Sequence, residues 1–103
     1  MSARQFSAGE VAVPERPAPH PDVETAFLQP EAVLYDARSA AVIHLNSSAA
    51  AVWMLMDGTL DISALVVEIA SIFGVSPDAV SADVHAVLNQ FARRNLLVEG
   101  PSE

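Results

Sequence analysis

The stretch HLNSSAAAVWMLMDG, residues 44–58, changes structural character twice within a few residues. It begins as the end of an extended apolar segment, reaches Asn46 and Ser47, and stops at Asp57-Gly58. Asn or Ser at such a boundary accepts a hydrogen bond from the first free amides of a helix. Asp-Gly is typical of the turn that follows one. A strand, a short helix capped by Asn46 or Ser47, and a turn are therefore predicted in direct succession.

The only tryptophan of the chain lies on this short helix. Together with Val52, Leu55 and Met56, Trp53 supplies nearly all of the bulk of the helix. Loss of a buried tryptophan costs a domain ~3–5 kcal/mol. We therefore expect Trp53 to be buried and the helix to act as a wedge between N-terminal strands and later helices. An exposed tryptophan that anchors a partner is the alternative.

Extended segments are predicted before the helix. Glu31–Asp36 and Ala40–Leu45 are rich in β-branched and aliphatic residues, and the polar spacer between them suits a hairpin loop. A further short strand at residues 24–29 would end at Pro30. Alternate side chains of a regular strand share one face. On the second hairpin strand, one face carries Ala41, Ile43 and Leu45, and the other carries Ala40, Val42 and His44.

The N-terminal region is rich in proline, with four of the seven prolines in PERPAPHP, residues 14–21. Proline lacks an amide donor and fixes φ, which favours an extended, solvated arm. We therefore divide the chain into a flexible arm at residues 1–23, a folded domain at 24–98 and a tail at 99–103.

Two longer helices are predicted after the turn. Asp61 caps the first and Gly74 ends it, while Ser76 caps the second and Pro77 occupies its first turn. Apolar residues recur every three or four positions along both helices, which marks the sides that pack into the core. These residues are Ile62, Leu65, Val66, Ile69, Ile72 and Phe73 in the first helix, and Val80, Val84, Val87, Leu88 and Phe91 in the second.

The charge of the chain argues against several classes of partner. Thirteen acidic residues and five arginines give a formal net charge of −8. Nucleic-acid binders need cations to displace phosphate counterions, and an acidic surface repels anionic lipid headgroups. No apolar run approaches the ~18 residues of a membrane span. We therefore expect neither a nucleic acid nor a membrane as partner, and the absence of cysteines and of a secretory signal suits a cytoplasmic location.

No residues with catalytic or metal-binding spacing stand out. His20, His44 and His85 lack the i, i+4 spacing of a helical metal site. The serines lack a glycine elbow or a phosphate loop, and without cysteine there is no thiolate ligand or nucleophile. We therefore expect no enzymatic activity, no cofactor and no metal.

Several short motifs follow one another in a specific order. They are Leu45-Asn46, Val52-Trp53, Asp57-Gly58, the helix from Ile62 to Phe73 with Gly74, Asp83-Val84, and Asn95-Leu96-Leu97. In this order they resemble the PqqD-like family, the peptide-binding modules of ribosomal-peptide maturation that are also called RiPP recognition elements. The resemblance covers residues 31–98. Asn95 departs from it, since many relatives have glycine there, and so does the proline-rich arm.

The resemblance implies an α+β, winged helix-turn-helix-like fold, in which an N-terminal β-hairpin or three strands precede three α-helices. It also implies a non-catalytic chaperone that captures the leader of a ribosomally made precursor peptide by strand addition. Such a chaperone presents the leader to a modifying enzyme, such as a radical SAM protein, in PQQ-type cofactor biosynthesis or a related pathway. The expected site is the free edge of the second hairpin strand with a stripe along the third helix. Its residues are Ala41, Val42, Ile43, His44, Leu45, Asp83, Val87, Gln90 and Arg94.

Other functions remain as alternatives. The chain could be an acidic protein–protein interaction module with no precursor peptide. A winged-helix DNA binder is less favoured, because its third helix would carry Asp78 and Asp83 toward phosphates. An acyl carrier protein would need an Asp-Ser-Leu attachment site, which the chain lacks. Either a monomer or an edge-strand homodimer fits an unpaired strand.

Overall fold

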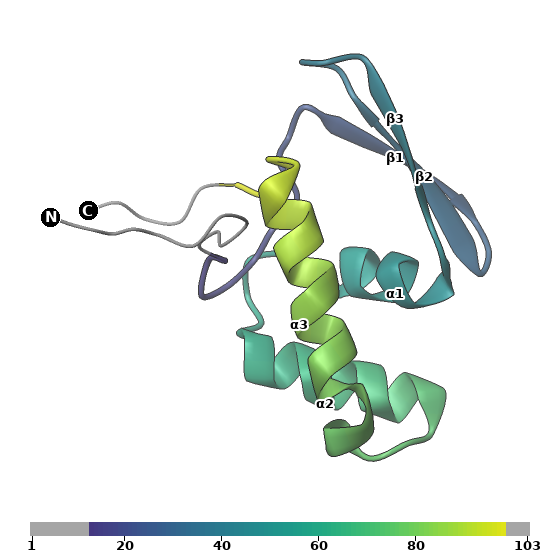
Figure 1. Ribbon diagram of the computed structural model, residues 1–103, viewed down its shortest axis with the longest axis vertical. Coiled ribbons are helices and arrows are strands. Elements are labelled where there is room, and N and C mark those ends of the chain that lie inside the picture. The colour runs from purple at the N-terminus through teal and green to yellow at the C-terminus, as the bar shows by residue number, and fades with distance from the viewer. Residues whose placement is uncertain (1–12, 99–103) are drawn as a thin grey trace, which may run out of the picture.

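The computed structural model describes residues 13–98, which form a three-stranded sheet followed by three helices (Figure 1). The α+β fold class is confirmed, and the strand expected near residues 24–29 is present. The strands are β1 (Val23–Leu28), β2 (Glu31–Asp36) and β3 (Ala41–Leu45), and the helices are α1 (Ser47–Leu55), α2 (Ile62–Phe73) and α3 (Pro77–Arg93).

The sheet is an antiparallel meander in the order β1-β2-β3, so β1 and β3 are its edges. In the register of the sheet, Leu34 of β2 lies opposite Thr25 of β1 and Ile43 of β3. Ala40, which we expected in the last strand, belongs instead to the turn before β3. Its φ of +62° is left-handed, a conformation that ends the turn and that a regular strand does not allow.

The core lies between the inner face of the sheet and the helices, with Trp53 at its centre. Trp53 is only 3% exposed, its ring meets Phe91 edge-on with centroids 5.1 Å apart, and its Nε1 donates to Oγ1 of Thr25 at 2.9 Å. Helix α1 packs against β2, β3, α2 and α3. The prediction of a buried tryptophan on a wedge helix is therefore confirmed.

Two of the three expected helix caps form as predicted. Oδ1 of Asn46 accepts from the Ala49 amide at 2.9 Å, and Oδ1 of Asp61 accepts from the Ala64 amide at 2.8 Å. Ser76 occupies the cap position of α3, but its side chain makes no capping hydrogen bond, so that part of the prediction is wrong. Pro77 follows it at the first helical position and has no amide hydrogen to be capped.

The apolar stripe of α2 is buried only in part. Leu65, Val66 and Ile69 are buried, whereas Ile72 and Phe73 are 53% and 43% exposed. We expected all of them in the core. The last turn of α2 lies beside the first turns of α1, where residues 47–51 are only serine and alanine and leave space unfilled.

Part of the proline-rich segment packs on the domain rather than standing in solvent. Pro17 is buried, the His20 amide donates to the Leu96 carbonyl at 2.8 Å, and the Val98 amide donates to the Ala18 carbonyl at 2.9 Å. The expectation of a solvated arm is therefore wrong for this stretch. Residues 1–12 and the tail at 99–103 lie outside the described residues, and the division into arm, domain and tail stays a prediction.

A helix that crosses a bilayer must be both long enough and apolar enough. Between residues 13 and 98 no single helix meets both requirements, and α2 with α3 meets them only as a pair bent by 119°.

Candidate peptide-binding site

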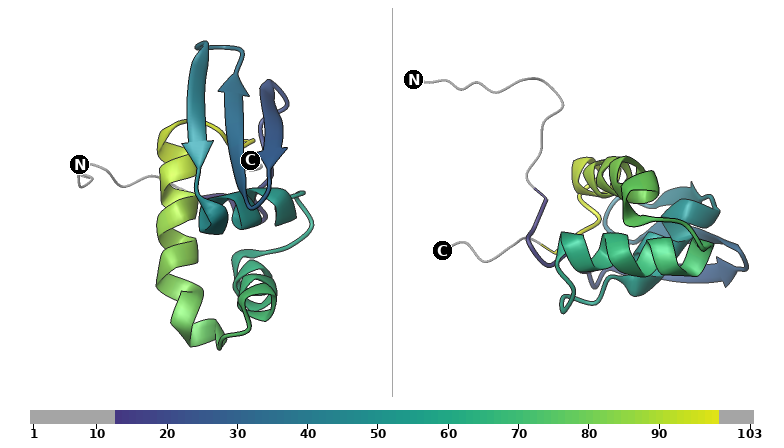
Figure 2. Two further views of the ribbon diagram at one scale, coloured as in Figure 1. Left: turned by 90° about the vertical axis from the view of Figure 1, so that its right-hand side faces the viewer. Right: turned by 90° about the horizontal axis from the view of Figure 1, so that it is seen from below.

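Strand β3 has one side without a partner strand among residues 13–98. It pairs with β2 on its other side, and the order of the sheet ends there. Figure 2 shows β3 at the border of the sheet that faces α3. The expected free edge is thus present in the described part of the chain.

The hydrogen bonds at the start of β1 show which backbone groups of β2 face β3. The Ala37 amide donates to the Asp22 carbonyl at 3.1 Å, and these two residues lie directly opposite each other in the register that pairs Val23 with Asp36. Hydrogen-bonded and non-hydrogen-bonded pairs alternate along an antiparallel ladder. The Val23–Asp36 pair is therefore not hydrogen-bonded, and the backbone of Asp36 points away from β1 toward β3. The Asp36 carbonyl accordingly accepts from the Ala40 amide at 2.7 Å.

The same alternation continues into β3. Ala41, Ile43 and Leu45 lie opposite Asp36, Leu34 and Ala32, the residues of β2 whose backbone faces β3. In this register the amides and carbonyls of Ile43 and Leu45 bond to β2, whereas the Ala41 amide donates to Oγ of Ser39 at 3.3 Å. The amides and carbonyls of Val42 and His44 consequently point to the open side, where no strand of residues 13–98 pairs with them.

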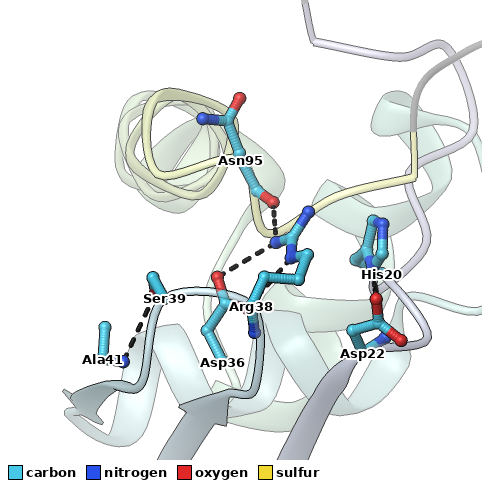
Figure 3. A network of polar contacts seen from close by, with 7 residues as sticks. All are labelled: His20, Asp22, Asp36, Arg38, Ser39, Ala41 and Asn95. Carbon is cyan, nitrogen blue, oxygen red and sulfur yellow. Dashed lines mark hydrogen bonds and ion pairs between the residues drawn. The ribbon is translucent and has the colours of Figure 1, made fainter.

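A polar clamp holds the β2–β3 turn against the end of α3 (Figure 3). Arg38 donates through Nε to Oδ1 of Asp36 at 2.9 Å and through Nη2 to Oδ2 at 3.0 Å, and Nη2 also donates to the Asn95 carbonyl. Asp36 is 5% exposed, and its hydrogen bonds with Arg38 hold the pKa of its carboxyl below the usual value. Asn95 has a φ of +59°, which turns the chain after α3. The Ala41 end of β3 therefore lies near the C-terminal end of α3.

A cavity of about 200 Å³ lies near the other end of β3. Ser48 lines it from the start of α1, three residues after Leu45, and Asp83 and Val87 line it from α3. Helix α3 therefore runs alongside β3 in the opposite direction. The remaining lining residues are apolar: Val52, Ile69, Phe73, Val75, Ala79, Val80 and Val84.

The structure brings the predicted residues of β3 to two different surfaces. Leu45 is buried and Ala41 and Ile43 are half-buried on the inner face. Val42, which is 70% exposed, lies on the outer face. His44 is also exposed there, and its Nε2 lies 2.8 Å from Oε1 of Glu31. The side chains of Val42 and His44 therefore point away from α3, and their backbone is what the open edge offers.

Only part of the predicted α3 stripe lines the cavity. Asp83 and Val87 line the cavity, and Val87 is half-buried while Asp83 is exposed. Gln90 and Arg94 are exposed and continue the same helical stripe toward the clamp. Helix α1 packs on both α3 and β3, and Figure 2 shows α3 beside the β3 border of the sheet.

Sequence reasoning missed the residues that form the other walls of the cavity. Ser48 and Val52 come from α1, and Phe73 and Val75 come from the α2–α3 junction. The available signal was the run of small residues at 47–51, which cannot fill the space above Phe73. A second hollow of about 140 Å³ lies across Phe73, and it includes Phe27, Pro30, Met54 and Ile72.

The described residues offer no arrangement for metal chemistry. Between residues 13 and 98, no three His, Asp or Glu side chains gather as metal ligands. Two carboxyl groups have a lowered pKa, Asp36 through Arg38 and Asp57 through hydrogen bonds from Thr59. Each of them holds a turn, which is a structural role.

Comparison with known proteins agrees with this fold. The chain is similar to TbiB1, solved in complex with the TbiA(beta) leader peptide, with 22% identity and a TM-score of 0.70 over 84% of this chain and 99% of that chain. It is also similar to the PqqD truncation of Methylobacterium extorquens PqqCD, described as a stand-alone RiPP recognition element, with 20% identity and a TM-score of 0.69 over 88% of this chain and 97% of that chain. At these low sequence identities, the two similarities establish the fold of the chain. No curated protein matches the sequence significantly.

The family comparison covers the elements that build the open edge and its flanking helix. The family model described as coenzyme PQQ synthesis protein D (PqqD) matches residues 31–97, from the start of β2 to the segment beyond α3. This is well over half of the chain, and the protein therefore belongs to the PqqD family.

Proposed function

We propose that this protein is a recognition element that binds the leader of a precursor peptide as a fourth strand on β3. The observation that carries the proposal is the open edge, where the amides and carbonyls of Val42 and His44 face away from β2. Membership in the PqqD family supports it. So does the likeness to TbiB1, which was solved with a leader peptide bound.

Estimates of the interaction energy are compatible with specific binding. Two residues of β3 offer four main-chain hydrogen bonds, each worth a net ~0.5–1.5 kcal/mol. An apolar side chain of the peptide in the cavity beside Val87 would add ~1.5–3 kcal/mol. These terms must exceed the cost of ordering an extended peptide, so the main chain supplies affinity and the cavity supplies selectivity.

In this proposal the protein performs no chemistry itself. It holds the leader in the cytoplasm while a modifying enzyme, such as a radical SAM protein, acts on the rest of the precursor. The acidic surface suits a protein partner better than a nucleic acid.

Amide hydrogen exchange tests the proposal directly. The labelled protein is titrated with synthetic leaders of short peptides encoded beside its gene, and size-exclusion chromatography checks for an edge-strand homodimer. Binding should slow exchange at Val42 and His44, whereas Ile43 is already bonded to β2 and should change little. Binding that leaves the exchange of Val42 and His44 unchanged would contradict strand addition.

A further inference from the structure

The strip of α3 surface that flanks the open edge of β3 carries opposite charges at its two ends. Asp83 lies at the end where the cavity opens, and Arg94 lies next to Asn95 at the clamp. We propose, in an inference that rests on the proposed function, that this strip selects an extended peptide with a basic residue toward its amino terminus and an acidic residue four or six positions later.

The direction of the peptide follows from the sheet. All neighbouring strands of the described sheet are antiparallel, and antiparallel pairing is slightly more stable per residue than parallel pairing. A peptide added antiparallel to β3 starts near Leu45 and ends near Ala41. Its amino-terminal part therefore passes Asp83, and its carboxyl-terminal part passes Arg94.

Both charges are available to a guest. Asp83 and Arg94 are exposed, and neither forms an ion pair within residues 13–98. The other charges beside β3 are occupied or turned away. Arg38 is paired with Asp36, and His44 is paired with Glu31 on the outer face of the sheet.

The spacing follows from the two backbone geometries. Eleven residues separate Asp83 from Arg94 along α3, and at ~1.5 Å per residue the two positions are ~16 Å apart. An extended strand covers that distance in about five residues, at ~3.4 Å each. Only alternate side chains of the peptide face α3, so the two charges must be four or six positions apart.

A displayed library of random 12-residue peptides tests the inference. The full chain is the bait in three forms: wild type, the charge-exchanged double variant Asp83→Arg with Arg94→Asp, and Val42→Pro. The Val42→Pro edge should bind an added strand at least about tenfold more weakly. The exchange keeps the net charge of the protein constant. Wild-type protein should enrich Lys or Arg before Asp or Glu, and the double variant should enrich the reverse order.

Enriched peptides are then measured by fluorescence anisotropy with both charge variants. Exchange of the two protein charges should weaken a wild-type-selected peptide about 2- to 10-fold, as expected for exposed ion pairs that become repulsive. The difference should shrink toward unity in 1 M salt, where charges are screened beyond ~3 Å. Thermal unfolding of each variant shows that the fold is intact.

The outcomes separate this inference from the proposed function. Peptides that are enriched without any order of charge would overturn the charge selection and leave strand addition standing. If the wild-type protein retains no more library peptides than the Val42→Pro variant does, strand addition is overturned, and the charge selection with it.

Discussion

Replacement of Val42 by proline should strongly weaken strand addition at the open edge while preserving the fold. The Val42 amide points away from β2, and its side chain is 70% exposed, so neither contributes to the core. Proline is tolerated on an edge strand where the missing amide would have faced solvent. The stability of the domain should therefore change by no more than about 1 kcal/mol, as for other surface substitutions.

Binding should respond much more strongly than stability. Loss of one main-chain donor removes ~0.5–1.5 kcal/mol, which is about a 2- to 13-fold increase in Kd. The proline ring also occupies the space where the peptide backbone would approach to ~4.8 Å, so the neighbouring bonds of the added strand weaken too. We expect a loss of about tenfold or more.

Two further substitutions provide the controls. Val42→Thr keeps the amide and the β-branched shape and should bind the leader normally. Ile43→Pro removes an amide that bonds to Leu34 of β2, leaves that buried carbonyl unpaired, and should cost about 1–3 kcal/mol of stability. Urea unfolding and anisotropy titration measure the two effects separately. Equal binding by Val42→Pro and Val42→Thr would refute the assignment of the outward-facing amides.

Three further predictions concern the scaffold. The Trp53–Thr25 hydrogen bond should give a coupling energy of about 1 kcal/mol in a double-mutant cycle of Trp53→Phe and Thr25→Val. Unfolding is followed by circular dichroism, because the only tryptophan is lost. A coupling energy near zero would show that the bond does not stabilise the domain. Because Arg38 lowers the pKa of Asp36, the stability that this carboxylate adds should be constant above about pH 5 and disappear as pH falls below about 4. Denaturation of wild type and Asp36→Asn across that pH range measures the difference in their free energies of unfolding. A difference that stays constant down to pH 2 would be inconsistent with the clamp. Gly74→Ala should lower the stability of the domain by about 1–2 kcal/mol through its φ of +70° alone, since no atom lies within 4 Å of the added Cβ. Gly74→Asn should lower it less in the same denaturation assay. Equal stability of wild type and both variants would contradict this prediction.

The elements that sequence predicted well are those with local signals. Asn46 and Asp61 cap helices through bonds to amides three residues away, and Gly74 ends α2 in a left-handed conformation. These interactions require only near neighbours in the chain. The edge position of β3 also followed from the family resemblance, and the order of the sheet agrees with it.

The features that sequence did not reveal depend on distant parts of the chain. Exposure of Phe73 results from small residues on a different helix, which periodicity within α2 cannot show. The outward direction of the Val42 and His44 backbone depends on the register between strands. The proline-rich segment lacks donors, but its carbonyls still accept, as that of Pro17 does from the Gly58 amide at 3.1 Å. Composition indicated the missing donors and not the available acceptors.

The pairing of the Pro19 and Leu97 segments has a consequence for how the protein can be joined to others. Both segments meet on the flank of α3 that lies away from β3 (Figure 1). A polypeptide fused through either segment would be anchored on that flank, away from the strip of α3 beside β3. The same module could thus be carried within a larger enzyme or supplied as a separate subunit without any redesign of its recognition surface.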